Sequence, residues 1–314
     1  MALQAIELNP AQEQVLRALR AAPGERPEFD RGLRDELRAE LEDRLSPLVP
    51  MLDTLGIDQL WVSKHRLSSV SGCEVRFLAE EEAGFEGWTV PMARGTVAHR
   101  AIELSMHMRG EPVPGALVDE AIARTTEADS SLGDWMQTIT EGDRADLRGE
   151  AVDRVSSFIE LWPPLKPQWR PRTESKVGAD LLGDRVHLAG KVDLTVGMPE
   201  GMVAGKVLID LKTGGFSPSH LEDLRFYALI ETIKLGVPPR RVATQYLDTG
   251  KLLAEDVSRA TLDAAVRRVG ECVRRWLELR GPDAGPVTKT GPACRWCPVL
   301  SSCAAGTAHL AAEA

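Results

Sequence analysis

The sequence has few cysteines, few aromatic residues and no long apolar run. Five cysteines in 314 residues are too few for the disulfide framework of a small secreted protein. No run of 18 apolar residues occurs, so no membrane span is expected. The N-terminal segment also lacks the basic and apolar parts of a secretory signal. We therefore expect a cytoplasmic protein that contacts no membrane.

An excess of positive charge is also missing. The net charge of −9 excludes a protein that coats nucleic acid through its overall charge, although a locally basic groove remains possible. Gly201 and Gly205 precede Lys206 with a spacing one residue short of a phosphate-binding loop, and no Ser or Thr follows. We expect no ATP-driven motor in this chain, so a motor such as a helicase would be a partner protein.

The hydrophobic pattern predicts an α/β protein with a mixed central sheet flanked by helices. Leucines at spacing four between residues 31 and 48 predict one helix, and residues 92–160 are mostly helical in pattern. After a proline-rich stretch the pattern becomes that of strands with two interspersed helices. The expected elements are strands at 173–177, 185–196, 206–212, 242–247 and 252–257, and helices at 217–236 and 258–281.

Charged residues interrupt two of the expected strands. Asp193 lies within the second strand, and Asp210 and Lys212 end the third. Residues two apart in a strand project from the same face, and antiparallel pairing of the two strands would bring Asp193 close to them. Two adjacent carboxylates favour a divalent cation, and a nearby ammonium suits metal-assisted phosphodiester hydrolysis. The alternative is an ordinary cross-strand salt bridge.

His99 lies near the expected start of a helix, on the side that carries Ile102 and Met106. A lone histidine on a buried helix face is usually a hydrogen-bonded core residue. Beside a pair of carboxylates, however, it becomes a candidate third metal ligand or acid–base group.

Three of the five cysteines, Cys294, Cys297 and Cys303, lie within ten residues. A metal site needs a fourth ligand, and Cys73 in a segment of small residues is the better candidate because Cys272 belongs to an apolar helix stripe. The ligand set does not separate zinc from iron. A tail of unligated thiols is the remaining alternative.

Taken in order, these motifs resemble those of RecB-type nucleases of the PD-(D/E)XK superfamily, in the iron–sulfur branch that includes AddB-like and CRISPR-associated RecB-like exonucleases. The resemblance covers about residues 68–303. It runs through the Cys73 segment, Gly95 to His99, Gly190 to Asp193, Asp210 to Gly214, Tyr227 and the three C-terminal cysteines.

The resemblance implies a restriction-endonuclease-like core and a role for each motif. Mg²⁺ or Mn²⁺ would be bound by Asp193, Asp210, His99 and the carbonyl of Leu211. Lys212 would orient or activate the attacking water, and Glu174 is a weaker candidate catalytic residue. A [4Fe–4S] cluster would be held by Cys73, Cys294, Cys297 and Cys303. The basic residues around the motifs predict a DNA channel, with Arg94, Arg225 and Tyr227 as contacts.

The resemblance also divides the chain. Residues 1–60 would form an N-terminal helical region, and 61–172 would hold the cysteine loop and the histidine motif. Residues 173–280 would be the nuclease core, and 281–314 the cysteine tail. One motif departs from the family, because Asp223 stands where a glutamine usually precedes the tyrosine by four residues.

The expected function is a metal-dependent deoxyribonuclease, acting as an exonuclease on single-stranded DNA or free ends in repair, recombination or defence. One alternative is a nucleic-acid-binding subunit of a larger complex with weak or no catalysis. A structural zinc protein with an unrelated core is the other.

Overall fold

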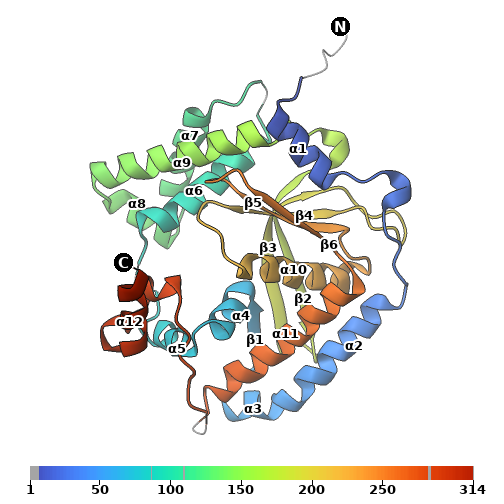
Figure 1. Cartoon of the computed structure of the whole chain (residues 1–314), viewed down its shortest axis with the longest axis vertical. Coiled ribbons are helices and arrows are strands. Elements are labelled where there is room, and N and C mark those ends of the chain that lie inside the picture. Colours follow the sequence, from blue (N-terminus) through green and yellow to red (C-terminus); the bar gives the residue numbers. More distant parts are fainter. Residues whose placement is uncertain (1–6, 86, 109, 282–283, 314) are drawn as a thin grey trace.

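A computed structural model describes residues 7–85, 87–108, 110–281 and 284–313. The chain builds a central mixed sheet with helices on both faces (Figure 1), which confirms the predicted fold class. Five strands follow the order β1-β3-β4-β5-β6, and β2 pairs with β3. The strands are β1 (Leu60–Ser63), β2 (Arg172–Leu181), β3 (Val186–Val196), β4 (Val207–Lys212), β5 (Arg241–Tyr246) and β6 (Leu252–Asp256).

Strand direction alternates through the sheet. β3 is antiparallel to both β2 and β4, as the carboxylate argument required, and parallel to the short strand β1. β4 and β5 are parallel, and β6 returns antiparallel to β5. β4 reads as a nearly continuous apolar run because both of its faces are covered.

The helices divide into two groups, one on each face of the sheet. Apolar side chains of α2, α4, α5, α10 and α11 form one core with residues such as Leu188 and Leu208, whereas α1 and α6 to α9 form a second core with Leu194 and Ile209. The helices are α1 (Pro10–Leu19), α2 (Leu33–Leu45), α3 (Val49–Thr54), α4 (Lys64–Ser71), α5 (Glu74–Ala83), α6 (Val90–Ser105), α7 (Pro114–Thr126), α8 (Ser131–Thr138), α9 (Glu141–Leu161), α10 (Ser219–Leu235), α11 (Arg259–Glu278) and α12 (Ala304–Glu313).

Local sequence explains several of these elements. The four leucines of α2 at spacing four are all buried, against α10 and α11. The Asn9 side chain accepts from the backbone N–H of Gln12 and caps α1, with Pro10 at the first helical position. α10 is buried on most sides because it lies between the sheet and the α2–α11 layer (Figure 1).

Two local expectations were wrong. The small residues Ser68 to Ser71 belong to helix α4 rather than to a loop, and only Gly72 and Cys73 separate α4 from α5. His99 lies in the middle of α6, because that helix already begins at Val90. Strand β1 was not foreseen at all. None of the helices in the described ranges combines the length and apolarity needed to cross a bilayer.

Candidate active site

The antiparallel ladder of β3 and β4 brings the two predicted carboxylates together. Leu194 and Ile209 are the last partners of this ladder, so Asp193 and Asp210 each lie next to its final pair. The Asp193 carboxylate accepts a hydrogen bond of 2.7 Å from the backbone N–H of Leu211, directly beside Asp210. Both acids line a cleft of about 400 Å³ together with His99 and Lys212.

A group of potential metal ligands forms around Asp193. His99 of α6, Glu174 of β2 and Asp193 of β3 each offer a ligand atom, and these atoms lie within 4.8 Å of one another. The His99 Nδ1 atom is 3.4 Å from the Asp193 carboxylate and 3.7 Å from that of Glu174. Its Nε2 atom lies 2.9 Å from the Leu211 carbonyl oxygen, so the carbonyl that was predicted as a metal ligand lies next to His99.

Glu174 occupies a strained position. Its φ is +49°, in the left-handed region that a non-glycine residue adopts at a cost of about 1 kcal/mol. The neighbouring residues of β2 pair regularly with β3, and Glu174 lies opposite Asp193 in that register. The distortion turns the Glu174 carboxylate toward His99 and the Lys191 ammonium. Strain retained in a cleft of charged residues is typical of functional sites.

Asp210 is held between two lysines rather than one. Lys212 Nζ lies 2.9 Å from one carboxylate oxygen, and Lys64 Nζ lies 3.0 Å from the other. Lys64 also lies 5.1 Å from the centre of the Tyr227 ring, in a cation–π contact. Lys64 is one of the basic residues near the Cys73 motif, and the sequence assigned it no separate role. Lys64 directly follows the short strand β1, which is the one local signal that it lies near the sheet. Its pairing with Asp210, 146 residues away, is not visible in the sequence.

Burial and charge set the protonation states in the cleft. Burial alone would lower the pKa of His99, but the Asp193 and Glu174 carboxylates outweigh it and raise that pKa to about 10. Burial would raise the pKa of Asp210, but Lys64 and Lys212 lower it to about 2. Asp210 is therefore ionised at neutral pH, and His99 is a cation until another positive charge replaces its proton.

The donor set fits a hard divalent cation. Carboxylate oxygens, a carbonyl oxygen and an imidazole nitrogen are ligands that Mg²⁺ and Mn²⁺ accept. Asp210 also keeps a buried oxygen, Oδ2, without a well-oriented hydrogen-bond donor in the described structure, although Lys212 lies close to it. This oxygen could bind a cation once the Lys212 ammonium moves away from it.

The three predicted DNA contacts have structural partners. Arg94 donates to Glu150 of α9 at 2.7 Å, and Arg225 is paired with both Glu222 and Glu255. Tyr227 is 2% exposed and packs against Gly190, where a Cβ atom would lie 2.2 Å from the ring. Position 190 must therefore be glycine for the Tyr227 ring to pack where it does.

Asp223, the departure from the family pattern, is also buried. Its carboxylate accepts a hydrogen bond of 2.8 Å from the Ser68 hydroxyl, which in turn accepts from Arg268. Burial raises the pKa of Asp223. The side chain thus ties α10 to α4, the helix that begins with Lys64.

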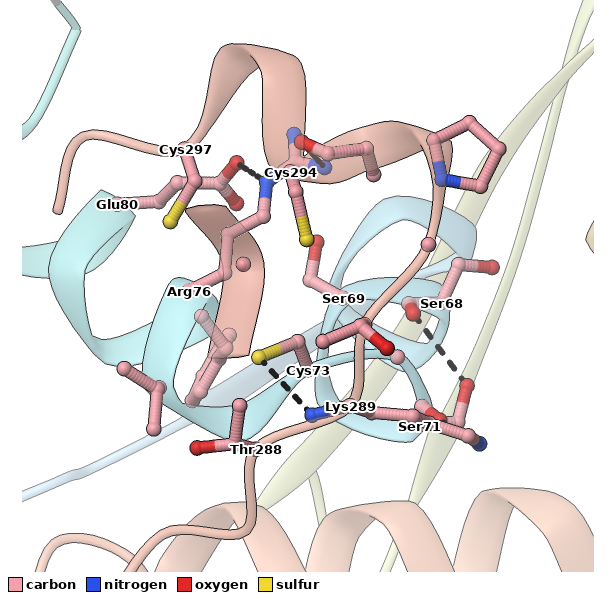
Figure 2. A pocket seen from close by; sticks show the side chains of 18 of the residues that line it. Ser68, Ser69, Ser71, Cys73, Arg76, Glu80, Thr288, Lys289, Cys294 and Cys297 are labelled. Atoms are coloured by element: carbon pink, nitrogen blue, oxygen red, sulfur yellow. Dashed lines mark hydrogen bonds and ion pairs between the residues drawn. The ribbon is translucent and has the colours of Figure 1, made fainter. Parts of the chain in front are cut away.

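The four predicted cluster cysteines line one pocket of about 610 Å³, whereas Cys272 is buried in the core. Figure 2 shows Cys73, Cys294 and Cys297 around this pocket. The backbone N–H groups of Lys289 and Gly306 approach the sulfurs of Cys73 and Cys303 at 3.4 Å. Within the described ranges, no three cysteine sulfurs come as close together as the ligand atoms of the His99 group.

Three comparisons with known proteins give the family of this chain and its similar structures. The family model of the PD-(D/E)XK nuclease superfamily matches residues 62–304. A solved structure described as "Putative exonuclease" from Eubacterium rectale is similar at 12% identity, over 79% of this chain and 89% of that chain, with a TM-score of 0.47. The structure of SSO0001 is similar at 13% identity, over 85% and 95%, with a TM-score of 0.33. No curated protein matches the sequence.

Proposed function

The chain belongs to the PD-(D/E)XK nuclease superfamily, and we propose that it is a metal-dependent deoxyribonuclease acting on single-stranded DNA or free ends. One observation carries this proposal: His99, Glu174 and Asp193 gather their ligand atoms within 4.8 Å, and His99 and Asp193 line the same cleft as Asp210 and Lys212. A structural salt bridge would not need this convergence of acids. The membership excludes the alternative of a zinc protein with an unrelated core.

His99, Asp193, Asp210 and the Leu211 carbonyl would hold Mg²⁺ or Mn²⁺, with Glu174 beside them. The ion supplies Lewis-acid activation of the scissile phosphate and of water. The backbone N–H of Leu211 fixes the Asp193 carboxylate in the orientation that faces His99. The His99 proton would have to be released before an imidazole nitrogen could bind the ion, and Nε2 is the nitrogen that lies beside the Leu211 carbonyl.

Lys212 would orient the attacking water and stabilise the negative charge that develops on the phosphate. Its ammonium lies at the end of β4, in the cleft and on Asp210. Lys64 would act as a positioning residue, because it holds the second oxygen of Asp210 and is itself held by the Tyr227 ring.

Nucleic acid would enter along the loop after β4. Phe216 is 63% exposed beside Gly214 and Gly215, which line the cleft. Its ring contacts Tyr246 and Lys251, and its exposed part would stack on a base. Arg94 and Arg225 would contact DNA only by exchanging their glutamate partners for phosphate. A role in repair, recombination or defence, with a separate motor protein, accords with a nuclease that carries no phosphate-binding loop.

The cysteine pocket would hold a [4Fe–4S] cluster and place the chain in the iron–sulfur branch. Four half-buried thiols with two backbone N–H···S contacts support this, since such contacts tune cluster thiolates. In a cubane each thiolate binds a different iron, so the sulfurs lie further apart than around one zinc ion. Anaerobic purification should give a brown protein with about four irons per chain; stoichiometric zinc without iron would refute the cluster.

The nuclease test uses end-labelled linear single-stranded DNA, circular single-stranded DNA and duplex DNA, each with Mn²⁺, Mg²⁺ or EDTA. Cleavage of the linear single strand with metal is expected, and Lys212→Ala should abolish it. Lys234→Ala is the matched control, because this exposed lysine lies in the last turn of α10, outside the cleft. Equal cleavage by wild type and Lys212→Ala would refute the proposal.

The second candidate is a nucleic-acid-binding subunit with weak or no catalysis. Asp223 favours it, because a buried acid tied to Ser68 has replaced the usual glutamine. In that case the same DNA would bind with metal present but would not be cut, and Asp223→Gln would restore cleavage.

A further inference from the structure

A second cavity of about 410 Å³ lies at the opposite end of β4 from the active site. Val207, the first residue of β4, lines this cavity. Asp210 and Lys212, at the other end of the strand, line the cleft. At about 3.3 Å per residue, the two ends of this strand are roughly 17 Å apart. The cavity is therefore separate from the proposed catalytic cleft.

The walls of this cavity are largely apolar. α1 contributes Val15, Leu16 and Leu19, and the segment after α9 contributes Trp162 and Trp169. Trp162 is buried, and its indole Nε1–H has no hydrogen-bond acceptor among the described residues. This Nε1–H has almost no accessible surface, so Trp162 offers the cavity the apolar surface of its ring and no hydrogen-bond donor.

The polar residues that line this cavity are mainly positive, in a chain whose net charge is −9. Arg20, Arg26 and Arg240 line it, and no acidic residue does so in the described structure. Arg26 lies 3.5 Å from Glu200, whose side chain is 77% exposed, so that pair is weak. The cavity thus presents donors and positive charge without an internal anion.

Arg240 provides the most specific observation. It is 6% exposed, and its guanidinium donates to the carbonyl of Leu19 at the end of α1. Among the described residues it forms no ion pair, because the neighbouring Asp256 is bound by both arms of Arg241. Burial, and then the charge of Arg241, lower the pKa of Arg240. Arginine nevertheless stays protonated, so a positive charge is buried without a carboxylate partner.

We propose that this cavity binds an organic anion, a small molecule with an apolar body and one terminal phosphate or carboxylate group. The leucine and tryptophan walls would take the body, and Arg240 and Arg26 would bind the anionic group, which a guanidinium can do through two hydrogen bonds. The volume is within the range of small-molecule sites, about 300–1,000 Å³. Inorganic phosphate would leave the apolar walls unfilled and would bind weakly.

The test measures binding to the full chain by titration calorimetry in EDTA, which disables the metal-dependent cleft. Thymidine 5′-monophosphate and octanoate are the two organic probes, one for a nucleotide and one for an aliphatic acid, and inorganic phosphate is the third. At least one organic probe is expected to bind at least tenfold more tightly than phosphate. The probe that binds identifies the source of the anion.

Two variants locate the site. Arg240→Gln and Arg26→Gln should each weaken the bound probe at least tenfold, and Arg26→Gln alone decides if Arg240→Gln fails to fold. Arg17→Gln removes the same charge from the exposed side of α1 and should change nothing. Asp210→Asn should also bind normally, so this result does not depend on the proposed nuclease activity. Failure of both organic probes to bind, or binding that ignores Arg26 and Arg240, would overturn the proposal.

Discussion

Gly190→Ala is expected to destabilise the protein by about 1–3 kcal/mol, the usual range for overpacking a filled core. An added Cβ would lie 2.2 Å from Cε1 and 2.8 Å from Cδ1 of the Tyr227 ring. Ordinary contact begins near 3.4 Å, so the ring or the strand would have to move by about 1 Å. The ring is 2% exposed and has little room to do so.

The displacement should also reduce nuclease activity, because the same ring lies against Lys64, which holds Asp210. Urea unfolding monitored by circular dichroism gives the free energy, and single-strand cleavage gives the rate. Tyr227→Leu supplies the control, since removing the outer part of the ring should make Gly190→Ala nearly neutral in a double-mutant cycle. An equal cost of Gly190→Ala in the Tyr227→Leu background would show that the Cβ–ring clash is not the cause.

Three further changes test the rest of the cleft. Lys64→Met should lower kcat by at least tenfold while Lys64→Arg keeps part of it, as measured by cleavage at saturating Mn²⁺; full activity in Lys64→Met would remove Lys64 from the site. Glu174→Gly should have a free energy of unfolding up to about 1 kcal/mol higher than Glu174→Ala, because both variants lose the ion pairs with His99 and Lys191 but only glycine adopts the observed φ of +49° without strain. Both should weaken Mn²⁺ binding, and a Glu174→Gly variant no more stable than Glu174→Ala would contradict the strain argument. In EDTA, the raised pKa of His99 contributes stability that is complete below pH 6.5 and is lost as the pH rises toward about 10. His99→Gln should flatten that part of the urea-unfolding profile, and an unchanged slope would assign it to other groups.

The sequence predicted those parts of the fold that depend on local pattern. The spacing of the α2 leucines and the alternation in β3 report burial directly, since each periodicity belongs to one type of element. The positions of Asp193, Asp210 and Lys212 within their strands predicted a shared site in the same way. Antiparallel pairing of β3 and β4 then brought them together.

The remaining features depend on contacts between distant segments. Lys64 reaches Asp210 only because β1 pairs with β3, and a strand of four residues gives too little pattern to be recognised. The serines after Lys64 favoured a loop by propensity, but Leu67 and Val70 are buried and stabilise α4 as a helix. The ion pairs of Arg94 and Arg225 likewise involve glutamates on other elements and could not be foreseen, while their assignment to DNA stays a prediction.

The charges of the cleft explain why metal and substrate should bind together. Glu174, Asp193 and Asp210 carry three negative charges. They are offset by three lysines, Lys64, Lys191 and Lys212, and by protonated His99. A divalent cation entering alone would repel ammonium groups that already occupy its carboxylates. A phosphodiester supplies the missing negative charge, because the lysines can turn from Asp210 to the phosphate. The internal cations therefore balance the carboxylates before metal binds, and would favour metal binding when nucleic acid is present.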